Sequence, residues 1–211
     1  MALAGDRRQR LHETRRVGPL RIEPDETVRK SLLQLIGRLI YALRGWSFEP
    51  LPSYWEGKQI IIGFPHSTWI DTVMAFAGFA IVCERGQVMV KREAFVWPLT
   101  ILLRAFGAVR VDRRSASGVV EQMAAEFASR ESFQLALVPE GTRRGASRIR
   151  TGFWHIAKAA QVPIVCWFLD AKSRRTRWVG RIVPSEDLAA DLREIKRMYA
   201  AAGLDITAID D

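Results

Sequence analysis

Two spacings of apolar residues alternate along this chain, and together they predict strands that alternate with helices. Short continuous apolar runs between glycine, proline or polar residues are typical of strands covered on both faces. Longer segments with apolar residues three, four and seven positions apart are typical of amphipathic helices. Strands are expected at residues 60–64, 87–91, 108–111, 133–138, 162–169 and 177–183, and helices at 27–46, 69–83, 94–106, 117–130, 151–160 and 185–201.

This order of elements predicts an α/β fold, with a mostly parallel central sheet flanked by helices. The 211 residues, of which 48% are hydrophobic, suffice for one core. We expect a flexible basic arm over residues 1–25 and a single domain over 26–211. No apolar run reaches the length of a transmembrane helix, and the charged start of the chain is not typical of a secretory signal.

The predicted helix at 27–46 allows two interpretations. Its apolar residues form one stripe, its arginines and lysine lie off that stripe, and Trp46 stands at its end. Such a basic amphipathic helix can lie on a membrane surface. It can equally pack on its own domain and expose its basic face to solvent, and both arrangements can hold at once.

Charge and cysteine content narrow the function further. The net charge of +9 favours an anionic partner, which could be nucleic acid, an anionic membrane surface or a phosphorylated substrate. Cys83 and Cys166 both lie in apolar segments, so we expect reduced, buried thiols and a cytosolic compartment. No metal-ligand spacing and no glycine-rich nucleotide loop is present, so neither a metal nor a bound cofactor is expected.

A histidine and an aspartate follow the first predicted strand. The strand ends at Pro65, and His66 and Asp71 come next, five residues apart. Five residues turn a helix through about 500°, so the two side chains can meet only if His66 precedes the helix and Asp71 is in its first turns. A carboxylate on one ring nitrogen would make the other nitrogen a general base for a substrate hydroxyl. The alternative is a structural histidine at a strand end.

Two further strands end in basic turns. Residues 138–143, VPEGTR, place Gly141, Thr142 and Arg143 after a strand, where backbone N–H groups, a hydroxyl and a guanidinium can bind a phosphate. Residues 107–114, GAVRVDRR, place Arg110 and Arg113 at another strand end. The alternative for both segments is solvated surface charge.

The order of these motifs resembles the block pattern of the PlsC-type glycerolipid acyltransferases. The pattern is H-x4-D, a strand ending at Lys91, G-x5-R from Gly107, PEGTR, and a strand that begins VPIV at residue 162. The similarity runs from about residue 60 to 169. Two blocks depart from the pattern: Trp69 and Ile70 make the first block more apolar, and Cys166-Trp167 stands where a second proline is common in the fourth.

The resemblance implies transfer of a fatty acyl group from acyl-CoA or acyl carrier protein to a lysophospholipid hydroxyl, with 1-acyl-glycerol-3-phosphate as the first candidate acceptor. It places the catalytic pair on His66 and Asp71. It places acceptor binding on Arg113 and on the PEGTR residues Glu140, Gly141, Thr142 and Arg143. A compact member of this kind is expected to be peripheral on the inner face of the cell membrane.

An acyl chain needs an apolar groove, and two segments contain the apolar residues for one. We expect its lining to include Trp69, Phe76, Phe95 and Trp97. Other acceptors stay open, such as lyso-ornithine lipid or a lysophospholipid under remodelling. The alternative from another class is a non-catalytic basic module on a membrane surface or on nucleic acid. Nucleic acid is not expected, because no nucleic-acid-binding motif is present.

Overall fold

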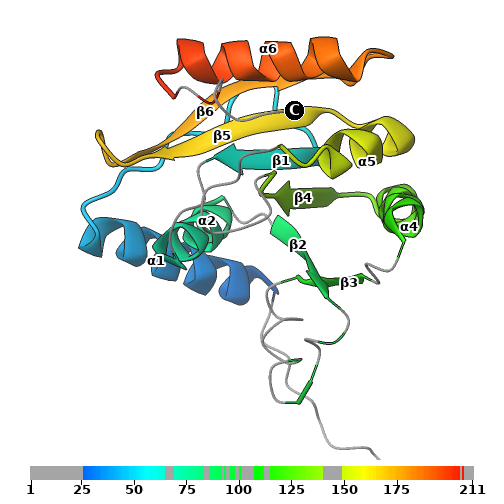
Figure 1. Ribbon diagram of the computed structural model, residues 1–211. Helices are drawn as coiled ribbons and strands as arrows, with labels where there is room; N and C mark the ends of the chain where they lie inside the picture. The colour runs from blue at the N-terminus through cyan, green and yellow to red at the C-terminus, as the bar shows by residue number, and fades with distance from the viewer. Residues whose placement is uncertain are drawn as a thin grey trace, which may run out of the picture.

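In the described part of the chain, six strands form one sheet in the order β3-β2-β4-β1-β5-β6 (Figure 1). The computed structural model describes residues 26–64, 69–82, 86–91, 93, 96, 97, 100, 107–111, 115–139, 149–204 and 206. The strands are β1 (Lys58–Phe64), β2 (Gly86–Lys91), β3 (Val109–Val111), β4 (Phe133–Leu137), β5 (Ile164–Asp170) and β6 (Arg175–Ile182). The helices are α1 (Glu26–Leu43), α2 (Trp69–Ile81), α4 (Ala116–Ser129), α5 (Gly152–Ala160) and α6 (Leu188–Ala201).

The expected α/β fold with a mostly parallel sheet is confirmed. Neighbouring strands from β3 to β5 pair in parallel, and β6 alone among the described strands runs antiparallel, on β5. Parallel neighbours need a crossover connection, which helices provide, whereas a short turn joins β5 to β6. The predicted arm over 1–25 lies outside the described residues, as does nearly all of the predicted helix at 94–106.

Side chains of successive strand residues point to opposite faces, and each face is covered by its own helices. On one face, Ile60, Ile62 and Phe64 of β1 pack in a core with residues of α4, α5 and α6. On the other face, a smaller cluster joins Leu169 of β5 to α1 and α2. Burial on both faces explains the continuous apolar runs in the sequence.

Helix α1 packs closely on α2, which confirms one of its two predicted arrangements. The Tyr41 hydroxyl donates to the carbonyl oxygen of Met74 at 3.1 Å, and the side-chain amide of Gln34 donates to the carbonyl of Ile81 at 3.2 Å. The two helices therefore run antiparallel. Gly37 lies between these contacts, where a Cβ atom would come within 2.5 Å of the Ala77 carbonyl oxygen.

We expect Gly37→Ala to destabilise the protein. Alanine is about 1 kcal/mol more favourable than glycine within a helix, but overpacking typically costs about 1–3 kcal/mol. The close approach to Ala77 should therefore outweigh the gain in helix propensity. Thermal unfolding should then shift down by a few degrees. Gly118→Ala in α4 is the matched control, because its Cβ would make ordinary contacts at 3.6 Å. A Gly37→Ala protein as stable as the Gly118→Ala protein would contradict this packing.

The start of the last helix differs from expectation. The helix was predicted to begin at Ser185, but α6 begins at Leu188 with Asp187 as its N-cap, and the Asp187 carboxylate accepts from the Ala190 N–H at 3.0 Å. Ser185 instead donates its N–H to Asp191, a buried first-turn acid that also accepts from the Trp154 indole at 2.7 Å. Asp191 is fixed by a tertiary contact with α5, which local sequence patterns do not show.

Candidate active site at the carboxyl edge of the sheet

The segments that carry the predicted chemistry all follow neighbouring strands. Because β3, β2, β4 and β1 are adjacent and parallel, their carboxyl ends share one edge of the sheet. Residues 65–71 follow β1, Lys91 ends β2, residues 112–114 follow β3, and residues 139–143 follow β4. The ends of β1 and β4, at Phe64 and Leu137, are thereby brought to one edge although they are 73 positions apart in sequence.

At the centre of this edge, two neighbouring strands connect to helices on opposite faces of the sheet. From β1 it passes to α2, whose Met74 and Ala77 pack on one face of the sheet. From the neighbouring β4 it passes to α5, whose Phe153 and Ile156 pack on the other face. Such a switch point leaves a crevice between the two departing connections, and open α/β sheets bind their ligands there. The last residues of the two strands, Phe64 of β1 and Leu137 of β4, mark this switch point.

The main chain places the predicted histidine and aspartate on either side of a helix start. Helix α2 begins at Trp69, so Asp71 is in its first turn, and His66 precedes the helix. His66 itself lies outside the described residues. A histidine before the helix and an aspartate in its first turn is the order that the two side chains need in order to meet, and their pairing stays a prediction.

The residues at the two ends of the predicted phosphate-binding segment, Pro139 and Arg150, are held next to each other. Pro139 is buried after β4, and its carbonyl oxygen accepts from the Arg150 N–H at 2.9 Å. Ile149, next to Arg150, is also buried in the core. The ends of the segment are therefore held together at the carboxyl edge. Its predicted binding residues Glu140, Gly141, Thr142 and Arg143 lie outside the described residues, as does Arg113.

The residues predicted to line an acyl groove are placed unevenly. Trp69 begins α2, and Phe76 is half-buried on the same helix. Trp97 is 84% exposed, and Phe95 lies outside the described residues. Of this expected lining, Phe76 alone among the described side chains is partly buried against the body of the protein.

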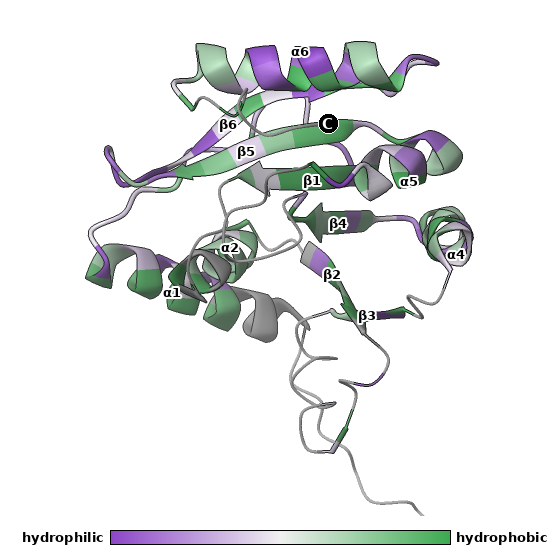
Figure 2. Cartoon of the chain, viewed as in Figure 1, coloured by the Kyte–Doolittle hydropathy of each residue, from purple (hydrophilic) through white to green (hydrophobic). Residues whose placement is uncertain are grey.

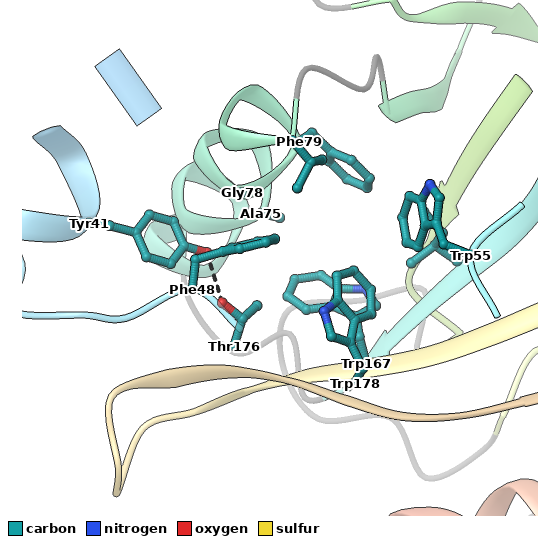
Figure 3. Close-up of a pocket in the computed structure, with 11 residues that line it drawn as sticks. Tyr41, Phe48, Trp55, Ala75, Gly78, Phe79, Trp167, Thr176 and Trp178 are labelled. Atoms are coloured by element: carbon teal, nitrogen blue, oxygen red, sulfur yellow. Dashed lines mark hydrogen bonds between the residues drawn. The ribbon is translucent and has the colours of Figure 1, made fainter. Parts of the chain in front are cut away.

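An aromatic pocket lies between α2, the segment that follows α1, and strands β5 and β6 (Figure 3). The Trp178 ring is in contact with those of Phe48, Trp55 and Trp167, at centroid separations of 6.2, 5.1 and 6.4 Å. The lining residues are Tyr41, Phe48, Trp55, Ile61, Ala75, Gly78, Phe79, Val82, Trp167, Thr176 and Trp178.

Comparisons with known proteins agree with this geometry. The sequence model of the Acyltransferase family matches residues 47–169, which is more than half of the chain and includes every motif segment at the carboxyl edge. This chain belongs to the acyltransferase family. The resemblance inferred from its motifs is thereby confirmed.

A solved structure shows the same fold. The crystal structure of PlsC, a 1-acyl-sn-glycerophosphate acyltransferase from Thermotoga maritima, is similar with a TM-score of 0.59. The two are 12% identical, and the match covers 86% of this chain and 82% of that one. A search of curated proteins found no significant match.

Three other reactive groups among the described residues of this acyltransferase are unsuited to catalysis, whereas Cys83, also expected to be buried, lies outside the described residues. Cys166 is a fully buried free thiol, as expected, and burial raises its pKa far above the ordinary range, so it stays protonated. Burial also raises the pKa of Tyr41 to about 12. His155 is exposed on α5, with its ring edge-on to Trp154.

Sequence reasoning missed most of the acyltransferase's aromatic pocket. Its rings come from α1, from the segment after α1, from α2 and from β5 and β6, and no local spacing connects these segments. One signal was available: Trp167 alternates with Cys166 and Phe168 on β5, so its side chain had to face the α2 side of the sheet.

Proposed function

We propose that this acyltransferase moves a fatty acyl group from an acyl thioester, acyl-CoA or acyl carrier protein, to a hydroxyl of a lysophospholipid-type acceptor. The first candidate acceptor is 1-acyl-glycerol-3-phosphate, which would give phosphatidic acid. The observation that supports this most strongly is the convergence of four motif segments on one edge of the sheet, around the β1–β4 switch point. The reaction needs no metal or bound cofactor.

In the proposed reaction, His66 removes the proton of the acceptor hydroxyl as its oxygen attacks the thioester carbonyl carbon. Asp71 orients the imidazole and stabilises its charged form. When the tetrahedral intermediate collapses, the carbon–sulfur bond breaks and the leaving thiolate takes the proton from His66. The products are an ester and a free thiol, so atoms and charge balance.

The acceptor phosphate is proposed to bind on the β4 and β3 sides of the same edge. Arg143 can bind two phosphate oxygens at once, and Arg113 adds a second positive charge. Backbone N–H groups near Gly141 and the hydroxyl of Thr142 donate further hydrogen bonds, with Glu140 in the same segment. The hydrogen-bonded ends of the segment, Pro139 and Arg150, limit how far these donors can move.

The acyl chain is proposed to lie along α2, from Trp69 and Phe76 toward the aromatic pocket, whose packed rings would have to move apart to admit its end. Asp71 is in the first turn of this helix, and Ala75 and Gly78 continue along it into the pocket lining. Aromatic and aliphatic walls suit a hydrocarbon chain, since burial of each methylene contributes about 0.8 kcal/mol.

Gly78→Ala should then shift the enzyme toward shorter acyl chains. The added Cβ would lie 3.0 Å from a ring carbon of Phe48 and 3.1 Å from the Tyr41 hydroxyl, so it narrows the pocket. We expect the ratio of long-chain to short-chain kcat/KM to fall by roughly tenfold. A series of acyl-CoA lengths measures this ratio, and Gly118→Ala is the control. An equal loss at every chain length would contradict the role of the pocket.

The membrane is the proposed location of this reaction, with α1 as a contact. Figure 2 shows hydrophobic residues along the side of α1 that faces away from the sheet. Leu35 and Leu43 are 64% and 77% exposed, although α1 is packed on α2. No helix in the described part of the chain is both long and apolar enough to cross a bilayer. We define the α1 stripe as Leu32, Leu33, Leu35, Ile36, Leu39 and Leu43.

A thiol-release assay tests the proposed function and separates the acceptors. The purified protein is given long-chain acyl-CoA or acyl carrier protein together with lysophosphatidic acid, other lysophospholipids or lyso-ornithine lipid. We expect thiol release that depends on an acceptor and is fastest with lysophosphatidic acid. A faster rate with another lysolipid would reassign the acceptor. No release with any pair would favour the non-catalytic membrane-surface module.

A further inference from the structure

The turn between β5 and β6 carries a cluster of exposed basic side chains next to the end of α1. We define the basic turn as Lys172, Arg174 and Arg175, all exposed. None of the ion pairs among the described residues includes these three side chains. Figure 2 shows this turn as a hydrophilic tip, and in Figure 1 it lies beside the carboxyl-terminal end of α1.

Hydrogen bonds hold the basic turn in one conformation. The Asp170 carboxylate accepts from the N–H groups of Lys172 and Ser173, at 3.0 and 3.2 Å, and from the Ser173 hydroxyl at 2.6 Å. These bonds, with that of the Ser173 hydroxyl the largest cause, lower the pKa of Asp170. Arg174 adopts a left-handed conformation, with φ of 53°. The turn therefore presents its cations from a fixed backbone rather than from a loose loop.

The basic turn is also fixed to the chain that leaves α1. The Ser47 N–H donates to the Arg174 carbonyl oxygen at 2.9 Å, and the Thr176 N–H donates to the Ser47 carbonyl at 3.1 Å. A Cβ atom on Gly45 would lie 3.2 Å from the Arg174 guanidinium. Arg44 and Leu43, the most exposed residue of the α1 stripe, come directly before Gly45. Cations and exposed apolar side chains are thus next to each other.

This combined surface lies at the same edge of the sheet as the candidate active site. The basic turn follows the carboxyl end of β5, and β5 is the parallel neighbour of β1. The carboxyl-terminal end of α1 lies toward the start of α2, because Tyr41 bonds to Met74 while Gln34 bonds to Ile81. A flat partner that touches the basic turn and the end of α1 would therefore face the edge to which His66 and Arg143 are assigned.

We propose that the basic turn, together with Arg44, is a binding site for anionic lipid headgroups that docks this edge of the protein on a bilayer. Headgroup phosphates would bind the cations while the α1 stripe enters the apolar boundary. The stripe favours a membrane over an acidic protein or nucleic acid, since neither of these would bury so many leucines beside the cations. Lipid binding by this surface does not depend on the proposed function. Only the advantage of docking for catalysis rests on it.

Sedimentation of the full chain with vesicles tests this site. We expect Lys172→Gln with Arg174→Gln and Arg175→Gln to weaken binding to phosphatidylglycerol-containing vesicles by at least about tenfold at low salt. Glutamine fits at position 174, because Gln161 already adopts the same left-handed conformation, with φ of 55°. Binding to neutral phosphatidylcholine vesicles should be nearly unchanged, whereas Leu35→Gln with Leu39→Gln and Leu43→Gln should weaken both.

The matched control removes as many cations elsewhere. Lys158→Gln with Arg193→Gln and Arg197→Gln changes the net charge equally, on α5 and α6. The proposal is overturned if this control loses as much binding, if the basic-turn variant loses nothing, or if it loses binding only to an acidic carrier protein. Thermal unfolding of each variant shows that the fold is kept.

Acyl transfer between detergent-dispersed substrates is measured in parallel. If wild-type protein binds vesicles as expected but transfers no acyl group, the proposed function fails and the lipid site stands.

Discussion

Replacement of His66 by alanine should abolish acyl transfer while the protein stays folded. A positioned general base contributes about 10²–10⁴-fold to a rate, and three reactive side chains of the described residues are unsuited to take over this role. His155 is exposed on α5, the Cys166 thiol is buried and protonated, and Tyr41 has a pKa of about 12. We expect a fall in kcat of about 10³-fold, with little change in substrate affinity.

His155→Ala is the matched control for this variant, since it removes a histidine that the proposed mechanism does not use. It should keep nearly full activity. Asp71→Asn should lose less than His66→Ala, on the order of 100-fold, because the imidazole remains but its tautomer is no longer fixed. If His66→Ala retains a rate close to that of His155→Ala, the assignment of the base is wrong.

Replacement of Arg143 by alanine should mainly weaken the binding of a phosphorylated acceptor. Loss of a charged, bidentate partner costs about 1.5–3 kcal/mol, so KM for lysophosphatidic acid should rise on the order of 100-fold. Arg143→Lys keeps the charge but not the fork of donors, and it should recover only part of the loss. Kinetics over a range of acceptor concentrations separate KM from kcat.

A neutral acceptor distinguishes this role from a general effect on the site. Monoacylglycerol has the hydroxyl but no phosphate, so Arg143→Ala should change its transfer rate little. Arg193→Ala, on the exposed side of α6, controls for the loss of one positive charge. Equal losses with the phosphorylated and the neutral acceptor would contradict phosphate binding by Arg143.

The sequence predicted the strands well because both faces of the sheet are buried. The core strand β1 is an unbroken apolar run from Ile60 to Phe64. A short apolar run of this kind, bounded by polar residues or proline, is readily recognised as a buried strand. Helix ends were less predictable. Helix α6 begins after Asp187 rather than at Ser185, whose N–H instead donates to the buried Asp191.

The motifs of the candidate site could be predicted from the sequence, but the position in the fold where they come together could not. H-x4-D and PEGTR mark the chemistry, whereas their convergence depends on the strand order, which sets β4 beside β1. The alternation of Trp167 on β5 was the one local signal for the aromatic pocket, and the basic turn had none. The ring centroids of Trp55 and Trp178 lie 5.1 Å apart although the two residues are 123 positions apart in the sequence. The basic turn becomes a candidate binding site only because the fold sets it beside the end of α1.

The central claim is that this protein transfers an acyl group to a lysolipid hydroxyl, and the fate of the acyl group tests it most directly. Mass spectrometry of the lipids, alongside thiol release, is applied to wild-type protein with acyl-CoA and lysophosphatidic acid. We predict one molecule of phosphatidic acid for each thiol released, and neither product with His66→Ala. Thiol release accompanied by free fatty acid, with no acylated lipid from any acceptor, would show a thioesterase and contradict the claim.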